Sequence, residues 1–353
     1  MGLVLGAGGV MGGAWLTGGL QALATVTGWD PASAEYVVGT SAGSMIGALC
    51  ASGVPPWFMV AHSSGEVFTG LVDVDGRPAA EASRSAGAEY RLERGIPRIV
   101  LGSPRLVVNS FKMGARRPAA MAAGWLPQGQ VSTEPLKRTV RRVVPSGWAP
   151  HPNYWAVAID YRSGERTVFG RDGSPVADLA DAVAASCAVP GFYAPVEIRG
   201  RRYIDGGIWS VSNLDLLAGL GLDVVICLNP MTSRHRPRGF KPGAQLAAAI
   251  RRPANRRLVD EARQVREGGA EVVLLQPTAR DLRIMGANWM SSKRRPEVIE
   301  TAIETVTDQL RDPAVAELLG HLPEGAAHKL RRPPGPPSSW PDILASPWAE
   351  AAS

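Results

Sequence analysis

The most constraining feature of the sequence is a glycine-flanked serine between a short apolar run and a helical pattern. Val37-Val38 leads into Gly39-Thr40-Ser41-Ala42-Gly43, and an apolar helical segment follows over residues 45–49. This order is typical of a strand, a sharp turn and a helix, with Ser41 at the apex, because the flanking glycines permit a strained backbone and expose the hydroxyl. The N-terminus of the following helix favours negative charge beside the serine. Taken alone, these residues fit a nucleophile and an ordinary glycine-rich turn equally well.

Composition indicates a globular protein whose charge is unevenly distributed. The 353 residues are 45% hydrophobic and 20% charged, which is ordinary for a globular chain and sufficient for a large core. The first Lys or Arg is Arg77, and five acidic residues precede it. Residues 1–76 therefore carry a net charge of −5 and residues 77–353 a net charge of +11, which gives +6 for the whole chain. Solvated surface is the favoured interpretation of this basic part. Peripheral contact with an anionic membrane is the alternative we retain, and no nucleic-acid partner is expected.

The N-terminus and the cysteines favour a cytoplasmic protein. A secretory signal needs a basic start, which this chain lacks. Six glycines between positions 2 and 13 make the apolar residues 1–26 a poor bilayer span. Cys50, Cys187 and Cys227 lie far apart in apolar surroundings, without a Cys-x-x-Cys pair. They therefore predict buried, unpaired thiols in a reducing compartment.

A second glycine-rich turn follows the first expected strand. Leu3-Val4-Leu5 reads as a buried strand, residues 6–13 contain five glycines, and residues 14–23 read as a helix. Such turns often bind nucleotide phosphates, but no register here gives Gly-x-Gly-x-x-Gly, and no P-loop lysine follows. The sequence therefore predicts a row of backbone N–H groups at a helix N-terminus, which can bind an anion without a nucleotide signature.

Strand and helix patterns alternate along the rest of the chain. Strands are expected over residues 154–159, 168–169, 196–198, 202–204, 224–228 and 271–275. Helices are expected over residues 179–188, 214–220, 245–267 with an interruption at Pro253, and 297–310. Alternation of this kind predicts an α/β fold in three layers, with a mostly parallel central sheet between helices.

A serine nucleophile needs a base, and the sequence offers a carboxylate rather than a histidine. Asp205 directly follows an apolar strand, and Gly206-Gly207 let the chain turn tightly and let another group approach the carboxylate. Asp-Gly-Gly occurs only once in the chain. A surface or structural role is favoured for each of the five histidines, which are His62, His151, His235, His321 and His328.

In this order and spacing, the glycine row, the serine turn and Asp205-Gly206-Gly207 resemble the motifs of the patatin-like phospholipases. The stretch 185–191 and the pair Ser212-Asn213 are also similar to that family's sequence around its aspartate. The resemblance covers roughly residues 3–310. It implies the patatin-like three-layer fold and acyl hydrolysis by a Ser-Asp dyad, with no metal and no organic cofactor.

The resemblance also implies a role for each matching position. Ser41 would attack the acyl carbonyl, and Asp205 would accept its proton and later help water attack the acyl-enzyme. The N–H groups of Gly8 and Gly9 would form the oxyanion hole, with Val10 or Ala7 as a third donor. The elbow and the dyad would be supported by four glycines, namely Gly39, Gly43, Gly206 and Gly207.

One position departs from the family's usual Gly-Gly-Gly-x-Arg/Lys-Gly pattern in a way that affects charge. The corresponding residues here are Ala7-Gly8-Gly9-Val10-Met11-Gly12. Ala7 adds only a methyl group. Met11 removes a cation beside the oxyanion hole but leaves the backbone donors in place. A serine acyl hydrolase is therefore better supported than a phospholipid substrate.

The resemblance further implies a division of the chain. We expect residues 1–312 to form a patatin-like acyl hydrolase domain, and residues 313–353 to form a short helix and a tail rich in Pro, Gly and Ala. Within the domain, residues from about 51 to 150 form a variable, partly helical segment that either covers the active site or packs as ordinary helices.

The expected function is hydrolysis of lipid acyl esters, as in a phospholipase A or another lipid acyl hydrolase. An acyltransferase or thioesterase using the same dyad in a biosynthetic pathway is the first alternative, and a catalytically silent lipid-binding protein is the second. A Ser-His-Asp hydrolase is a weaker alternative, in which His235, His321 or His328 would be the base.

Overall fold

The protein is built around an eight-stranded sheet. The computed structural model describes residues 1–64, 72–73, 102–112, 118–234, 242–325 and 330–331. Strands in the sheet are ordered β6-β7-β4-β2-β1-β8-β9, and β5 pairs with β4 outside this path. They are β1 (Gly2–Leu5), β2 (Tyr36–Thr40), β4 (Tyr154–Asp160), β5 (Arg166–Phe169), β6 (Val196–Ile198), β7 (Arg201–Asp205), β8 (Val224–Leu228) and β9 (Glu271–Leu275).

The five strands from β4 to β9 along the sheet are parallel, whereas β5, β6 and β7 join by antiparallel pairing. The parallel strands are almost continuous apolar runs because helices cover both of their faces. A further short pair, β3 (Val72–Asp73) with β10 (Leu330–Arg331), is antiparallel and separate.

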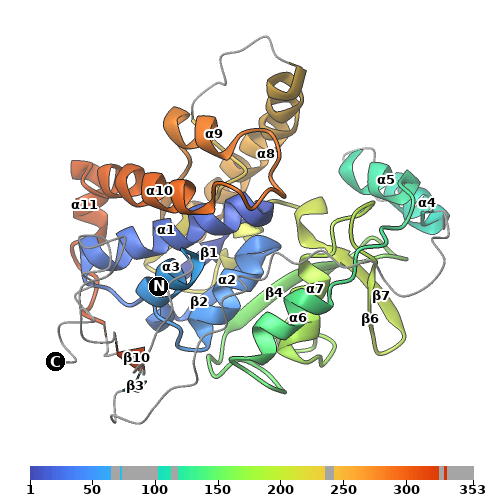
Figure 1. Ribbon diagram of the computed structural model, residues 1–353, viewed down its shortest axis with the longest axis horizontal. Helices are drawn as coiled ribbons and strands as arrows, with labels where there is room; N and C mark the ends of the chain where they lie inside the picture. The colour runs from blue at the N-terminus through green and yellow to red at the C-terminus, as the bar shows by residue number, and fades with distance from the viewer. Residues whose placement is uncertain (65–71, 74–101, 113–117, 235–241, 326–329, 332–353) are drawn as a thin grey trace.

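Helices lie on both faces of the sheet (Figure 1). They are α1 (Gly9–Thr27), α2 (Ala42–Ala51), α3 (Pro56–Ser63), α4 (Pro104–Lys112), α5 (Pro118–Trp125), α6 (Glu134–Arg141), α7 (Leu179–Ser186), α8 (Pro242–Glu267), α9 (Ala279–Met285), α10 (Arg295–Leu310) and α11 (Pro313–Leu319). Among the described residues, short 3₁₀ helices are η1 (Pro31–Ser33), η2 (Gly206–Ile208) and η3 (Leu214–Leu217). In the described part of the chain, none of these helices is long and apolar enough to span a bilayer.

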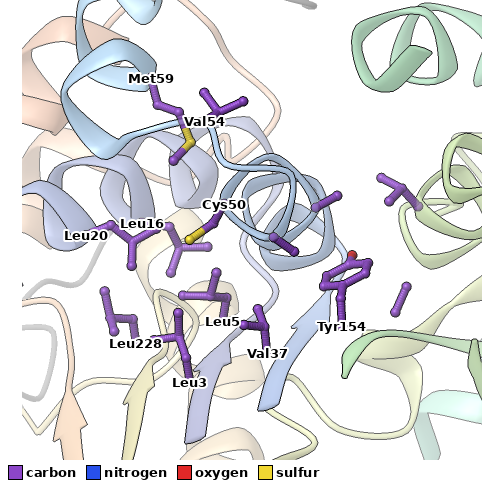
Figure 2. Close-up of a cluster of buried hydrophobic side chains, with 14 of the residues drawn as sticks. Leu3, Leu5, Leu16, Leu20, Val37, Cys50, Val54, Met59, Tyr154 and Leu228 are labelled. Atoms are coloured by element: carbon purple, nitrogen blue, oxygen red, sulfur yellow. The ribbon is translucent and has the colours of Figure 1, made fainter. Parts of the chain in front are cut away.

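Alternating side chains of β1 divide the core into two layers. Leu3 and Leu5 point to the face covered by α1, α2 and α10, while Val4 belongs to the cluster formed with α8 and η3 on the opposite face. Figure 2 shows Leu3 and Leu5 beside Leu16 of α1 and Cys50 of α2. Full burial of a side chain of this size stabilises the fold by about 1.5–3 kcal/mol. The expected α/β/α architecture with a mostly parallel sheet is confirmed.

Three helical segments differ from the expected ones by more than a few residues or in kind. First, α1 begins at Gly9, five residues early, because the glycine row itself forms the first turn of the helix. Second, residues 214–217 form only a 3₁₀ helix, and the chain then turns at Gly219 with a φ of 74°. Third, α8 is not interrupted at Pro253.

Helix α8 continues through Pro253 because both sides of the proline are anchored. An internal proline removes one backbone hydrogen bond and costs about 3 kcal/mol or more. On one side of it, Arg251 donates a hydrogen bond to the Pro230 carbonyl, and on the other Leu258 is buried against the sheet. These contacts offset the loss, which a local sequence pattern does not reveal.

Helices α3–α6 fall within the segment expected to be variable and partly helical. Residues 65–71, 74–101 and 113–117 of that segment lie outside the described residues. The pair α4 and α5 stands at one end of the molecule's longest axis, beyond β6 and β7 (Figure 1). In the C-terminal segment, α11 follows α10 directly, and residues 326–329 and 332–353 lie outside the description.

Candidate active site

Ser41 lies in the single-residue turn between β2 and α2. Its backbone has φ 53° and ψ −122°, a conformation that non-glycine residues rarely adopt and that stores strain of about 1–3 kcal/mol. Surrounding contacts hold it there, since the Ser41 carbonyl accepts hydrogen bonds from the Ser44 hydroxyl at 2.7 Å and the Cys187 thiol at 3.1 Å. The strained turn directs the hydroxyl away from the helix that follows, as expected of a nucleophile elbow.

The two glycines that flank the elbow are required by close backbone contacts. A Cβ added at Gly43 would lie 2.0 Å from the Leu5 carbonyl oxygen, and one at Gly39 would lie 2.5 Å from the Ser44 Cα. Both distances are far below van der Waals contact. The Gly-x-Ser-x-Gly pattern therefore reflects the close approach of α2 to β1 and β2, directly after the carboxyl end of β2.

Asp205 meets Ser41 at the end of β7. The Ser41 hydroxyl donates a hydrogen bond to Asp205 Oδ2 at 2.6 Å, and the Gly207 N–H donates one to Oδ1 at 2.7 Å. Both members of the pair are buried. Gly206 is again a position of close approach, since a Cβ there would lie 2.2 Å from the Val157 carbonyl oxygen. The structure thus brings together the two candidate catalytic residues and all four of their supporting glycines.

Burial sets the proton affinity of this carboxyl group. Burial raises the pKa of Asp205 more than the hydrogen bonds from Ser41 and Gly207 lower it, and the net result is a pKa of about 6 instead of 3.8. Removal of water destabilises the charged form of the carboxylate. Asp205 is therefore a stronger base than an ordinary aspartate, yet it is ionised at neutral pH.

Ser186 supports the elbow in a way the sequence did not reveal. Its hydroxyl accepts the N–H of Ser41 at 2.9 Å and donates to the Val157 carbonyl at 2.6 Å. The neighbouring Cys187 is buried, which raises its pKa to about 12, so the thiol stays protonated and remains a donor. Both residues lie in the stretch that resembles the family's sequence before its aspartate, which is the signal that points to them.

Asn213 ties the end of β2 to the chain beyond Asp205. Its side-chain amide donates to the Thr40 hydroxyl at 3.0 Å and to the Ser210 carbonyl at 2.7 Å. The adjacent Ser212 hydroxyl donates to the buried carboxylate of Glu261 at 2.6 Å. Burial raises the pKa of Glu261, and this hydrogen bond lowers it in part. The amide thus holds Thr40, the residue that precedes Ser41.

The glycine turn at the start of α1 lies beside the dyad. Within the described residues, no hydrogen bond engages the N–H groups of Gly8, Gly9 or Val10. Ala7 is excluded as an alternative donor because its N–H donates to the Val211 carbonyl at 2.7 Å. A Cβ added at Gly207 would lie 3.4 Å from that of Ala7. The three candidate oxyanion donors therefore stand at a helix N-terminus next to Asp205-Gly206-Gly207, where partial positive charge accumulates.

A buried cation lies behind this turn, although Met11 itself points into the apolar core. Arg251 of α8 donates to the Pro230 carbonyl at 3.0 Å, and its guanidinium lies 5.8 Å from the centre of the Trp289 ring. Burial lowers the pKa of Arg251 to about 10, which leaves it charged at neutral pH. Within the described residues, no carboxylate pairs with it.

Pro230 and Trp289, the two residues that Arg251 contacts, both touch the glycine turn. A Cβ added at Gly8 would lie 2.7 Å from Pro230 Cγ, and the Met11 N–H donates to the Trp289 carbonyl at 3.0 Å. Sequence reasoning did not find Arg251 or Trp289, because both lie more than 200 residues after the turn they support.

The described histidines hold positions away from the dyad's hydrogen bonds. His151 is bonded through its ring to the Ala34 carbonyl and the Asn153 N–H, His62 stacks on Phe58, and His321 is exposed. None of these three forms a hydrogen bond with Ser41 or Asp205. His235 and His328 lie outside the described residues.

Comparison with known proteins agrees with this arrangement. The model of the family described as patatin-like phospholipase matches residues 3–218, a range that includes both Ser41 and Asp205. Uncharacterized NTE family proteins from Mycobacterium bovis and Mycobacterium tuberculosis are 37% identical over 76 residues. That match spans 22% of this chain and 20% of each relative's length. On the strength of the family match, the chain belongs to the patatin-like phospholipase family.

Proposed function

We propose that this protein is a serine acyl hydrolase that cleaves acyl esters of lipids through an acyl-enzyme on Ser41, with Asp205 as the general base. The observation that carries the proposal is the buried 2.6 Å hydrogen bond from the Ser41 hydroxyl to Asp205 Oδ2. A nucleophile and a base within hydrogen-bond reach, with the base held by a third group, are what acyl transfer to a serine requires. Here the third group is the Gly207 N–H.

In the acylation half-reaction, Ser41 Oγ forms a bond to the acyl carbonyl carbon while its proton moves to Asp205. The carbonyl π electrons move to the oxygen and give a tetrahedral oxyanion. When this intermediate collapses, the bond to the leaving oxygen breaks, and Asp205 returns the proton to that oxygen, so the alcohol departs neutral. A base whose pKa is about 6 accepts and returns a proton near neutral pH with little cost.

Deacylation repeats these steps with water. Asp205 takes a proton from water as its oxygen attacks the acyl carbon, a second oxyanion forms, and collapse releases the carboxylic acid. The proton held by Asp205 then returns to Ser41 Oγ. One carboxylate therefore serves both half-reactions.

The N–H groups of Gly8, Gly9 and Val10 are the proposed oxyanion hole. Loss of one such donor typically raises the barrier by about 3–4 kcal/mol. Pro230 and the Trp289 carbonyl fix this turn from behind, and the positive charge of Arg251 adds an attractive potential for the oxyanion. The turn is therefore arranged before substrate arrives, which is the source of its effect on rate.

A fluorophosphonate label and a substrate panel test the proposal. Wild type, Ser41→Ala and Asp205→Asn are compared on phospholipid vesicles, a soluble p-nitrophenyl ester and an acyl-thioester. We expect wild type to be labelled and to release fatty acid, and Ser41→Ala to be unlabelled with kcat roughly 1,000-fold lower. Ser52→Ala, which removes a hydroxyl bonded to the Ala48 carbonyl within the same helical segment, is the matched control.

Two results would contradict the proposal. Equal labelling and turnover by Ser41→Ala would remove Ser41 as the nucleophile. Turnover seen only with a thioester, or only after an acceptor alcohol is added, would replace hydrolysis of lipid esters by thioesterase or acyltransferase activity.

A further inference from the structure

The helix pair α4–α5 lies at one end of the molecule (Figure 1), and large apolar side chains are exposed on it and directly after it. Trp125 is 75% exposed, Val108 53% and Leu126 45%. Among the large apolar side chains exposed in the described residues, Trp125 has the greatest exposed fraction. A tryptophan in this position is costly in water and favourable at a lipid headgroup boundary, where its ring is apolar and its N–H finds a partner.

The inner face of the same pair is buried, so the pair is amphipathic with an apolar outer end. Leu106 of α4 and Ala123 of α5 pack with Ile159 of β4 and Ile204 of β7 in a small core cluster. The pair is therefore anchored on the sheet through this cluster. The exposed side chains of Val108, Trp125 and Leu126 take no part in this cluster.

An arginine-lined pocket of about 790 Å³ lies at the base of α4. Four arginines contribute to its wall, namely Arg105, Arg162, Arg201 and Arg202, whereas Asp160 is the only carboxylate among the described residues that line it. One oxygen of that carboxylate already accepts the N–H groups of residues 162 and 163, and the other lies 3.7 Å from Arg201 Nη1. The pocket therefore keeps a net positive charge and fits an anionic group.

The pocket and the exposed apolar side chains adjoin each other. Gly102 is part of the pocket wall. A Cβ added there would lie 2.0 Å from the Gly124 carbonyl oxygen and 2.5 Å from that of Leu126. The backbone on either side of Trp125 thus rests against the pocket wall, and apolar and cationic groups form one continuous surface.

We propose that this surface docks the protein on an anionic phospholipid bilayer. The docking surface consists of three apolar and four cationic side chains, which are Val108, Trp125, Leu126, Arg105, Arg162, Arg201 and Arg202. Apolar side chains enter the headgroup boundary while arginines bind lipid phosphates, the combination that holds peripheral proteins on membranes. The combination of apolar and cationic side chains favours a bilayer over a free anion, because a free anion would contact only the arginines and would leave Trp125 and Leu126 exposed to water.

The docking surface is connected to the dyad through short stretches of chain. Ile204, at the base of the helix pair, immediately precedes Asp205, and η2 immediately follows it. Leu126 Cδ1 would lie 3.6 Å from a Cβ added at Gly191. Gly191 follows the turn in which the Ala188 carbonyl accepts the Asp205 N–H. The docking surface and the dyad therefore share β7, with Arg201 at its first residue and Asp205 at its last, so a bilayer on this surface lies about one strand length from the dyad of the proposed lipid hydrolase.

Vesicle flotation measures the interaction independently of catalysis. All variants carry Ser41→Ala, so binding is read without turnover, and loss of binding is distinguishable from failure of the proposed hydrolase function. Vesicles of phosphatidylcholine alone are compared with vesicles in which about one lipid in three is the anionic phosphatidylglycerol. We expect binding to the anionic vesicles that weakens as salt rises.

Two double variants separate the apolar and cationic contributions. Trp125→Ala with Leu126→Ala should weaken binding to anionic vesicles by roughly tenfold or more while leaving its salt dependence in place. Arg162→Gln with Arg201→Gln should weaken it about 25-fold, or about fivefold per arginine, and flatten the salt dependence. The control is Val259→Ala with Arg263→Gln on α8, which removes an apolar side chain of 63% exposure and an exposed arginine elsewhere.

The proposal is overturned if either double variant binds within twofold of its Ser41→Ala parent, or if the α8 control loses binding to the same degree. Unfolding midpoints of all variants verify that they fold. Quenching of tryptophan fluorescence by brominated lipid provides a second measurement. We expect part of this quenching to disappear in Trp125→Phe, and unchanged quenching would place another surface in the membrane.

Discussion

Ser186 holds the backbone of Ser41 through a hydroxyl that accepts the Ser41 N–H at 2.9 Å and donates to the Val157 carbonyl at 2.6 Å. Val157 belongs to β4, the strand that lies between β2 and β7 in the sheet. The Ser186 hydroxyl therefore connects the strained turn at Ser41 to β4. This strand lies between β2, which ends before Ser41, and β7, which ends at Asp205. We expect the distance between Ser41 and Asp205 to depend on this connection.

Replacing Ser186 by alanine should lower both stability and activity. The change leaves the buried N–H of Ser41 without a partner, which costs about 1–3 kcal/mol. It also frees the elbow to relax, so we expect kcat to fall roughly tenfold or more. Chemical denaturation and initial rates on a soluble ester measure the two effects. Ser52→Ala is the control, and unchanged kcat together with lowered stability would limit Ser186 to a structural role.

The pH dependence of kcat/KM should report the ionisation of Asp205. The carboxylate must be charged to accept the proton of Ser41, and burial raises its pKa to about 6. Activity should therefore rise with pH through a midpoint near 6 and level off above 7. Asp205→Asn should lower kcat roughly 100- to 10,000-fold. A flat profile from pH 5 to 8 would show that another group limits the reaction.

Asp205→Asn should also stabilise the fold at neutral pH. Because the pKa of Asp205 is higher in the folded state (about 6) than its ordinary value of 3.8, its contribution to stability is complete below about pH 4 and is lost as pH rises through 6. The ionised group then costs about 3 kcal/mol. We expect the free energy of unfolding of Asp205→Asn to exceed that of wild type at pH 8. The difference should be about 1.4 kcal/mol smaller at pH 5, and an equal difference at both pH values would contradict this.

Two glycine positions should respond in opposite ways to alanine. A Cβ at Gly43 would meet the Leu5 carbonyl oxygen at 2.0 Å, whereas one at Gly13 would meet only Ala42 Cβ at 3.8 Å. Gly43→Ala should therefore displace α2 and abolish labelling of Ser41. Gly13→Ala, inside α1, should be tolerated and raise stability by up to about 1 kcal/mol. Thermal unfolding and fluorophosphonate labelling test both, and labelling of Gly43→Ala at the wild-type rate would contradict the elbow geometry.

Arg251 should affect the chemical step more than substrate binding. Its guanidinium bonds to Pro230, which packs on Gly8, and lies over Trp289, which accepts the Met11 N–H. Arg251→Met should lower kcat roughly tenfold with little change in KM, as expected for an interaction that matters in the transition state. Arg251→Lys should recover part of the loss by restoring the charge. Arg252→Met, at an exposed position of the same helix, is the control.

The sequence predicted those parts of the fold and site whose causes are local. Apolar runs such as Val37-Val38 gave the buried strands, because parallel strands covered on both faces leave no polar positions. Ser41 and Asp205 could be identified because each stands in a glycine pattern that close backbone contact requires. The structure then explained the patterns, since Gly39, Gly43 and Gly206 each lie where a Cβ would overlap neighbouring backbone.

Features that depend on distant contacts could not be predicted. Ser186 acts on a residue 145 positions earlier, and Arg251 acts on the glycine turn through Pro230 and Trp289. Helix α8 passes through Pro253 because tertiary contacts outweigh a local preference. These interactions have no sequence period or spacing of their own. The family-like stretch pointed to Ser186 as a residue, but only the three-dimensional arrangement reveals its partners.

Strand β1 pairs with one strand inside the region that matches the family and with one strand beyond it. This strand carries the glycine turn and pairs with β2 on one side and β8 (Val224–Leu228) on the other. The region that matches the family ends at residue 218, before β8 begins. A fragment limited to the matched region would leave β1 as an open edge with unpaired backbone groups, which invites aggregation. The region that matches the family thus lacks the strand that pairs with the second side of β1, and an expression fragment should extend at least through β8.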